Sequence, residues 1–243
     1  MFGKAKKGIG IASKDMGMGI DESVLLAAKK SVSEYVERWA HAHDKFSIQY
    51  KLDTTGFAAM PRSIKNIELT KHKSYCEAVE KFSVMKFWDN SEISFGSCKD
   101  KSNENITYIF PKINDSSLYV CIAVLTSGKK AWVGSSCSSS LCEASNKAKL
   151  EALAHKDGCA LLQKGKRCDL EVYEKRLNYL MHFGSELLEK RLSKDGTSEI
   201  KIPDIEINRQ VECKKYSRFY IHQTRLKGQK NFLDDNFIDV GYV

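Results

Sequence analysis

The sequence predicts an α+β fold in which antiparallel β-hairpins pack against long helices. Residues 119–125 place successive side chains on opposite sides, which is the period of two of a β-strand. Residues 126–129 then supply a turn, and residues 130–134 return as the second strand of a hairpin. After the serine-rich run 135–140 the apolar residues change to helical spacing. A hairpin followed by a helix is therefore expected in the middle of the chain.

The predicted helix has a capping signal at its start, where Ser140 and Glu143 occupy the two positions of a capping box. Its apolar residues are Ala144, Ala148, Leu150, Ala152 and Leu153. Upstream of the hairpin, residues 106–113 predict a further strand, and residues 70–88 predict an amphipathic helix. The expected order of this part is helix, three strands, helix.

This order and its motif resemble a double-stranded RNA-binding domain. The matching residues are Gly134, Ser135, Ser140, Glu143, Ala144, Ala148 and the pair Ala152-Leu153. The resemblance covers residues 70–162, and it implies an α-β-β-β-α module that recognises duplex RNA through its shape and phosphates. Three lysines of the family pattern are replaced here by Leu141, Cys142 and Ser145. The fold is therefore better supported than the phosphate contacts.

The chain before this module divides into two segments. Residues 1–20 are basic and rich in glycine, which predicts a flexible arm. Residues 21–69 begin with an amphipathic helix over 21–42, capped by its first residue, and continue with strands at 46–52 and 64–69. This order of elements is similar to that of the central module, so a degenerate tandem copy is one hypothesis.

The segment after the module, 163–243, combines a helix with a basic and aromatic stretch. It begins with a basic loop at 164–167 and a leucine-rich helix over 169–193, followed by an extended piece at 200–203. Residues 231–243 form an acidic and aromatic end that could fold back or dock a partner.

Composition and charge favour a soluble protein that binds a polyanion. The net charge of +8 is concentrated in two places: four lysines without an acid in residues 1–14, and seven basic residues against one acid in residues 209–230. The absence of a long apolar run or signal-like segment predicts an intracellular protein, cytoplasmic or else nuclear, without a membrane span. The eight cysteines lack metal-site spacing and are expected to be free thiols.

Basic and aromatic residues are the candidate contacts for RNA, because phosphates bind Lys and Arg while bases stack on aromatic rings. These candidates are Lys147, Lys149, Lys164, Lys166, Arg167, Lys214, Lys215, Tyr216, Arg218, Phe219, Arg225 and Lys227. The C-terminal members of the set could instead form an ordinary amphipathic strand or helix with a solvated basic face.

No nucleophile elbow, zinc-protease motif or phosphate loop is present, so neither catalytic residues, a metal site nor a cofactor is predicted. The leading hypothesis is a non-catalytic protein that binds double-stranded or structured RNA. The alternative is a structural, self-associating protein, such as a viral matrix, capsid or nucleoprotein-like subunit, in which the same fold forms a homo-oligomer.

Overall fold

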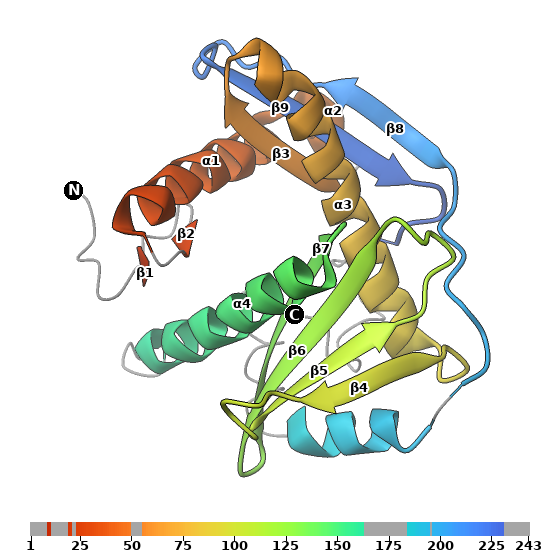
Figure 1. The fold of residues 1–243 in the computed structure, drawn as a ribbon. Helices are drawn as coiled ribbons and strands as arrows, with labels where there is room; N and C mark the ends of the chain where they lie inside the picture. The colour runs from red at the N-terminus through yellow and green to blue at the C-terminus, as the bar shows by residue number, and fades with distance from the viewer. Residues whose placement is uncertain are drawn as a thin grey trace. The chain divides into compact units, whose positions relative to one another are not determined.

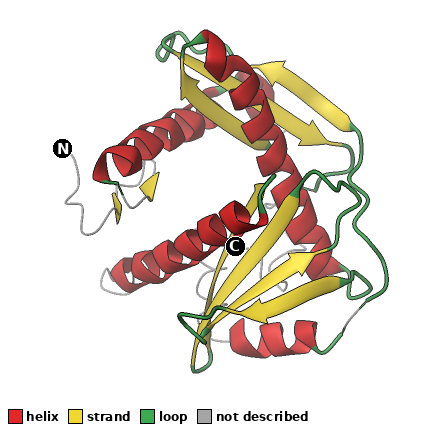
Figure 2. Ribbon diagram, viewed as in Figure 1, coloured by secondary structure: helices red, strands yellow, loops and turns green. Residues whose placement is uncertain are grey.

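The computed structural model describes residues 9–10, 19–20, 23–49, 55–162, 184–194 and 196–230. The described residues form two compact units. The first contains the chain up to Ala78 together with the stretch from Pro203 to Lys230, and the second contains Val79–Ile202. Helices and antiparallel strands are combined in both units (Figure 2). The predicted α+β class is therefore confirmed.

The first unit is built on a three-stranded antiparallel sheet of order β3-β9-β8. Its strands are β3 (Gly56–Pro61), β9 (Phe219–Leu226) and β8 (Ile205–Gln210). Helix α1 (Val24–His43) packs on one face of this sheet, where Val36 and Ala40 meet Phe57, Ala59 and Ile221 in the core. These side chains alternate along β3, so the opposite face of the strand is left for another helix.

Helix α3 (Ile64–Asp89) covers that opposite face with its first half. The hydroxyl groups of Ser74 and Thr224 are 2.7 Å apart, which joins the helix to the central strand β9. A Cβ added to Gly56 would lie 1.8 Å from the carbonyl oxygen of Ser74, so only glycine allows this close approach. The first unit is thus a sheet with a helix on each face.

The second unit is built on a four-stranded antiparallel sheet of order β4-β5-β6-β7. Its strands are β4 (Phe95–Lys99), β5 (Ile106–Pro111), β6 (Tyr119–Ser127) and β7 (Lys130–Ser138). Helix α4 (Leu141–Leu162) lies across β6 and β7 (Figure 1). It buries Cys121, Ala123 and Leu125 beneath its small residues Ala144 and Ala148.

A glycine again sets the helix–sheet distance in this unit. A Cβ on Gly134 would lie 2.3 Å from the carbonyl oxygen of Ala148 and 2.4 Å from the backbone nitrogen of Ala152. The other face of the sheet carries a helical stretch at 184–192, whose Ser185 N–H donates to the carbonyl of Lys129 at 3.3 Å. The four-stranded sheet is therefore also covered on both faces.

Several sequence predictions are confirmed in this unit. Strands β6 and β7 pair in the predicted hairpin, with Gly128 at a positive φ of 60° in the turn. The backbone N–H of Glu143 donates to the hydroxyl of Ser140 at 3.4 Å, as expected at the start of α4. All cysteines whose side chains are described are free thiols, among them the buried Cys121.

The two strands predicted at 46–52 and 64–69 are wrong. Residues 46–49 belong to helix α2 (Lys45–Gln49), because the Asp44 carboxylate accepts hydrogen bonds from the N–H and the hydroxyl of Ser47 and so caps a helix. Residues 64–69 are the first turns of α3, which continues without a break into the helix predicted at 70–88.

Strands β3 and β4 were not predicted, and each lacks the alternation that marks a strand. Most of β3 is buried on both faces, so its apolar residues are continuous. Strand β4 is an exposed edge strand held by its pairing with β5. Because of β4, the order between α3 and α4 is four strands, and the α-β-β-β-α module expected over 70–162 is not confirmed.

The N-terminal part shows smaller differences. The side chain of Ser23, rather than Asp21, accepts from the N–H of Leu26 at the start of α1. Within the predicted arm, β1 (Ile9–Gly10) and β2 (Gly19–Ile20) form a short antiparallel pair. The loop at 164–167, most of the helix predicted over 169–193 and the end at 231–243 lie outside the described residues. The segment boundaries drawn from the sequence stay predictions.

Among the residues that the structure describes, no helix is both long and apolar enough to span a membrane.

Replacing Gly134 by Ala is expected to lower the free energy of unfolding by roughly 1–3 kcal/mol, because the new methyl group overlaps backbone atoms of α4. Gly96→Ala is the matched control, since a Cβ there has no atom within 4 Å. Urea unfolding of both variants at neutral pH measures the difference. Equal stability of the two variants would show that α4 does not pack this closely on β7.

Candidate functional site

The most unusual polar feature of the first unit is a pair of carboxylates at the free edge of strand β3. The backbone N–H of Phe57 donates to Oε2 of Glu77 at 2.9 Å, and the N–H of Ala59 donates to Oε1 of Glu37 at 2.7 Å. Glu77 comes from α3 and Glu37 from α1, the helices on opposite faces of the sheet. Two acidic side chains thus converge on one strand edge from both sides.

The second unit has the same arrangement at the free edge of strand β7. The N–H of Ser135 donates to Oε2 of Glu151 at 2.7 Å, and the N–H of Cys137 donates to Oε2 of Glu80 at 3.2 Å. The Ser135 hydroxyl also donates to Oε1 of Glu80 at 2.7 Å. Glu151 belongs to α4 and Glu80 to the second half of α3.

The two edges share a local pattern. In each, a glycine precedes the first bonded residue, as Gly56 precedes Phe57 and Gly134 precedes Ser135. The N–H of the residue after the glycine donates to a glutamate of the helix that packs against that glycine. The N–H two residues later donates to a glutamate of a different helix. The two edges therefore satisfy their backbone N–H groups in the same way, although the element order that had suggested a tandem copy is not found.

Burial gives the Glu37 carboxyl group unusual electrostatics. The pKa of Glu37 is raised from 4.5 to about 8, first by burial and then by the negative charge of Glu77. The hydrogen bond from the Ala59 N–H opposes this shift. Glu37 therefore keeps a proton at neutral pH while it lies close to a second carboxyl group, an arrangement typical of functional sites.

Carboxylate oxygens are suitable ligands for a hard cation such as Mg²⁺. Within the described ranges, no three His, Cys, Asp or Glu side chains are grouped in a way that could hold a metal ion by themselves. Each strand edge presents two carboxylates, which is the number that Mg²⁺ commonly takes from a protein when substrate phosphates and water complete its shell. The donor sets therefore fit a metal bound together with a phosphate ligand.

Several residues proposed as RNA contacts from the sequence form ion pairs. Lys147 pairs with Glu143 at 2.5 Å, and Lys149 donates to Asp100 at 2.8 Å. Hydrogen bonds from Lys149, Ser102 and Tyr108 hold the pKa of Asp100 well below its usual value, so this pair is a partly buried structural link. The remaining two pairs, both in the first unit, are Arg225 with Glu206 at 3.1 Å and Lys227 with Asp204 at 3.2 Å.

The aromatic candidates pack on the first unit. Tyr216 contacts Tyr35 and Trp39 edge to face, and Phe219 packs against the core of that unit. The ammonium group of Lys215 lies 4.7 Å from the ring centre of Trp39. Lys214 and Arg218 are exposed. The candidates Lys164, Lys166 and Arg167 lie outside the described residues.

No family model and no curated protein matches this chain. Among solved structures, the chain is similar to YcaO from Methanopyrus kandleri, whose structure was determined bound with AMPPCP and Mg²⁺. The TM-score is 0.53 at 13% sequence identity, over 93% of this chain and 81% of that chain. At this level of identity, the likeness concerns the fold.

These findings correct the main functional expectations. The resemblance to a double-stranded RNA-binding domain is wrong, since the likeness spans nearly the whole chain and leads to YcaO. The expectation of a non-catalytic RNA-binding protein, with a viral, self-associating subunit as its alternative, is contradicted by the same likeness, because the similar protein is YcaO, determined with AMPPCP and Mg²⁺. Leu141 and Cys142, which replace two lysines of the double-stranded RNA-binding domain pattern, are exposed.

The four glutamates were missed by the sequence analysis. Glu77 and Glu80 are three residues apart on α3, and this Glu-x-x-Glu spacing places both on one side of a helix. That spacing was the available signal. Glu37 and Glu151 have no comparable signal, because only the folded sheets bring them to the strand edges.

The raised pKa of Glu37 predicts how stability depends on pH. Between pH 4.5 and about 8 the folded protein keeps a proton that the unfolded chain has released, so stability falls as pH rises, by at most about 1.4 kcal/mol per pH unit. Glu37→Gln is expected to flatten this fall, as measured by urea unfolding at several pH values across this range. Glu68→Gln, an exposed change on α3, is the control that leaves it unchanged. A Glu37→Gln protein with the wild-type slope would exclude this titration.

Proposed function

We propose that the protein is an enzyme that binds and uses a magnesium–nucleoside triphosphate complex. The observation that carries the proposal is the convergence of Glu37 and Glu77 at the edge of β3, repeated by Glu80 and Glu151 at the edge of β7. The fold likeness to a protein bound with AMPPCP, a methylene analogue of ATP, and Mg²⁺ supports the choice of ligand.

The chemistry of the carboxylates agrees with this choice. Mg²⁺ is commonly held by one or two protein carboxylates together with substrate phosphates, and here it would supply positive charge to neutralise those phosphates. Within each unit the pair at the strand edge would hold the metal, Glu37 with Glu77 in the first unit and Glu80 with Glu151 in the second. A divalent cation would also relieve the repulsion between Glu37 and Glu77.

The backbone contacts explain how the chain would keep these ligands in place. Each glutamate uses one carboxylate oxygen to accept a strand N–H, which fixes the rotamer of a long side chain. In Glu80 the second oxygen also accepts the Ser135 hydroxyl, which holds that side chain at both oxygens. Ligands held in this way lose little conformational freedom when a metal binds.

The proposal is tested by isothermal titration calorimetry with ATP in the presence of Mg²⁺ and in EDTA. The wild-type protein is expected to bind ATP only with Mg²⁺. Glu77→Gln and Glu80→Gln are each expected to weaken this binding at least tenfold, because Gln keeps an oxygen for the strand N–H but removes the negative charge that the metal needs.

Glu68→Gln is the matched control, since Glu68 lies on the same helix, is exposed and pairs with Lys71. It should leave the affinity unchanged. Circular dichroism and thermal unfolding confirm that the variants are folded. Magnesium-independent binding, or equal affinity in the Glu77, Glu80 and Glu68 variants, would overturn the proposal.

A further inference from the structure

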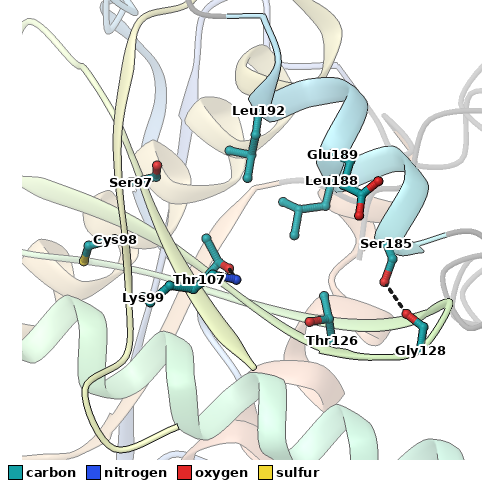
Figure 3. A pocket seen from close by; sticks show the side chains of 10 residues that line it. All are labelled: Ser97, Cys98, Lys99, Thr107, Thr126, Gly128, Ser185, Leu188, Glu189 and Leu192. Atoms are coloured by element: carbon teal, nitrogen blue, oxygen red, sulfur yellow. Dashed lines mark hydrogen bonds between the residues drawn. The ribbon is translucent and has the colours of Figure 1, made fainter. Parts of the chain in front are cut away.

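The second unit contains a pocket toward the β4 edge of its sheet, whereas the carboxylates lie at the β7 edge. It lies where the outer strands β4 and β5 and the β6–β7 turn face the helical stretch at 184–192, and its volume is about 430 Å³. This volume is within the range of small-molecule sites. Figure 3 shows side chains from the strands and from the helical stretch around it.

The pocket has an apolar wall and a polar floor. Leu188 and Leu192 project from the helical stretch toward the strands (Figure 3), and Leu188 is buried. Hydroxyl groups line the other sides, from Thr107 on β5, Thr126 on β6 and Ser185 at the start of the helical stretch. Such a site can bury an apolar group while it forms hydrogen bonds with a polar one.

The pocket also carries one charge of each sign. Lys99 lies on the edge strand β4, and its ammonium group donates to the Thr107 hydroxyl at 2.9 Å, which directs it along the pocket floor. Glu189 lies at the rim on the helical stretch. Within the part of the chain that the structure describes, neither side chain takes part in an ion pair, so both charges remain to meet a ligand.

We propose that this pocket binds a small zwitterion, namely a free α-amino acid with an apolar side chain. The Lys99 ammonium would bind the carboxylate, with Thr107 as a neighbouring donor, and the Glu189 carboxylate would bind the amino group. The ligand side chain would pack on Leu188 and Leu192. Charge-assisted hydrogen bonds at both ends would distinguish such a ligand from molecules with a single charge.

Other small ligands fit the pocket less well. A nucleotide carries several negative charges, whereas the lining includes one cation and an opposing anion. A wholly apolar ligand would remove water from the hydroxyl and charged groups without replacing their hydrogen bonds. This inference does not depend on the proposed nucleotide site, because the pocket shares no residue with the four glutamates.

The test is a titration of the full chain with four probes, followed by calorimetry and by backbone amide NMR shifts. The probes are L-leucine, 4-methylpentanoate, which lacks the amino group, 3-methylbutylamine, which lacks the carboxylate, and glycine, which lacks the side chain. L-leucine is expected to bind at least tenfold more tightly than each of the others and to shift the amide signals of Thr107, Thr126 and Ser185.

Two variants test whether the charged side chains of the pocket bind the two ends of leucine. Lys99→Met and Glu189→Gln are expected to weaken leucine binding at least tenfold and at least threefold, respectively. The matched controls are Lys101→Met, an exposed lysine two residues along the chain, and Glu186→Gln, an exposed glutamate one turn away. Both controls should bind leucine within twofold of wild type.

Three outcomes would overturn the proposal. They are no saturable binding of leucine, equal affinity for leucine and 4-methylpentanoate, or equal affinity of the Lys99→Met and Lys101→Met proteins for leucine. The probe series uses the unmodified chain, so it decides the question even if a variant fails to fold. Magnesium–ATP binding is measured separately, and loss of either activity leaves the other proposal intact.

Discussion

The hydrogen-bonding needs of two edge strands constrain both units. An edge strand presents a row of backbone N–H groups without a neighbouring strand, and such groups must be satisfied by other partners when water is excluded. In β3 and β7 the partners are glutamate carboxylates from the helices on both faces of each sheet. For the side chains to reach the edge, the helices must lie very close to the strands. Gly56 and Gly134 permit that distance.

This arrangement places two carboxyl groups at each strand edge. A hydrophobic or neutral side chain there would lose less hydration free energy on burial. Burial and the negative charge of Glu77 raise the pKa of Glu37, and the charge of Lys73 opposes this only in part. Asp100 provides the contrast, because Lys149, Ser102 and Tyr108 stabilise its charged form and lower its pKa. A carboxylate with a purely structural role is expected to look like Asp100, whose charge is balanced by Lys149 and by hydrogen bonds. At the β3 edge a bound cation would relieve the repulsion between Glu37 and Glu77, and for this reason we place the proposed function at the strand edges.

The candidate site was only partly accessible to sequence reasoning. The sequence predicted RNA contacts at lysines and aromatic residues. In the structure, Lys149 forms a salt bridge with Asp100, and Tyr216 packs against Tyr35 and Trp39. The spacing of Glu77 and Glu80 could have been noticed, since it depends on one helix alone. Glu37 is twenty-two residues from Ala59 in sequence, and Glu151 is sixteen from Ser135, so no local pattern connects the partners.

The sequence by itself determined the elements whose period is strong and local. These are helices α1 and α4, the β6–β7 hairpin with its turn at Gly128, and the α+β class. Tertiary structure decided the rest. Strand β4 forms because β5 offers it a partner, residues 46–49 become helical because Asp44 caps them, and β9 becomes the centre of a sheet although its residues are mixed polar and apolar. Pairing, capping and burial act between residues far apart in the chain or against its local preference, and a periodic pattern cannot encode them.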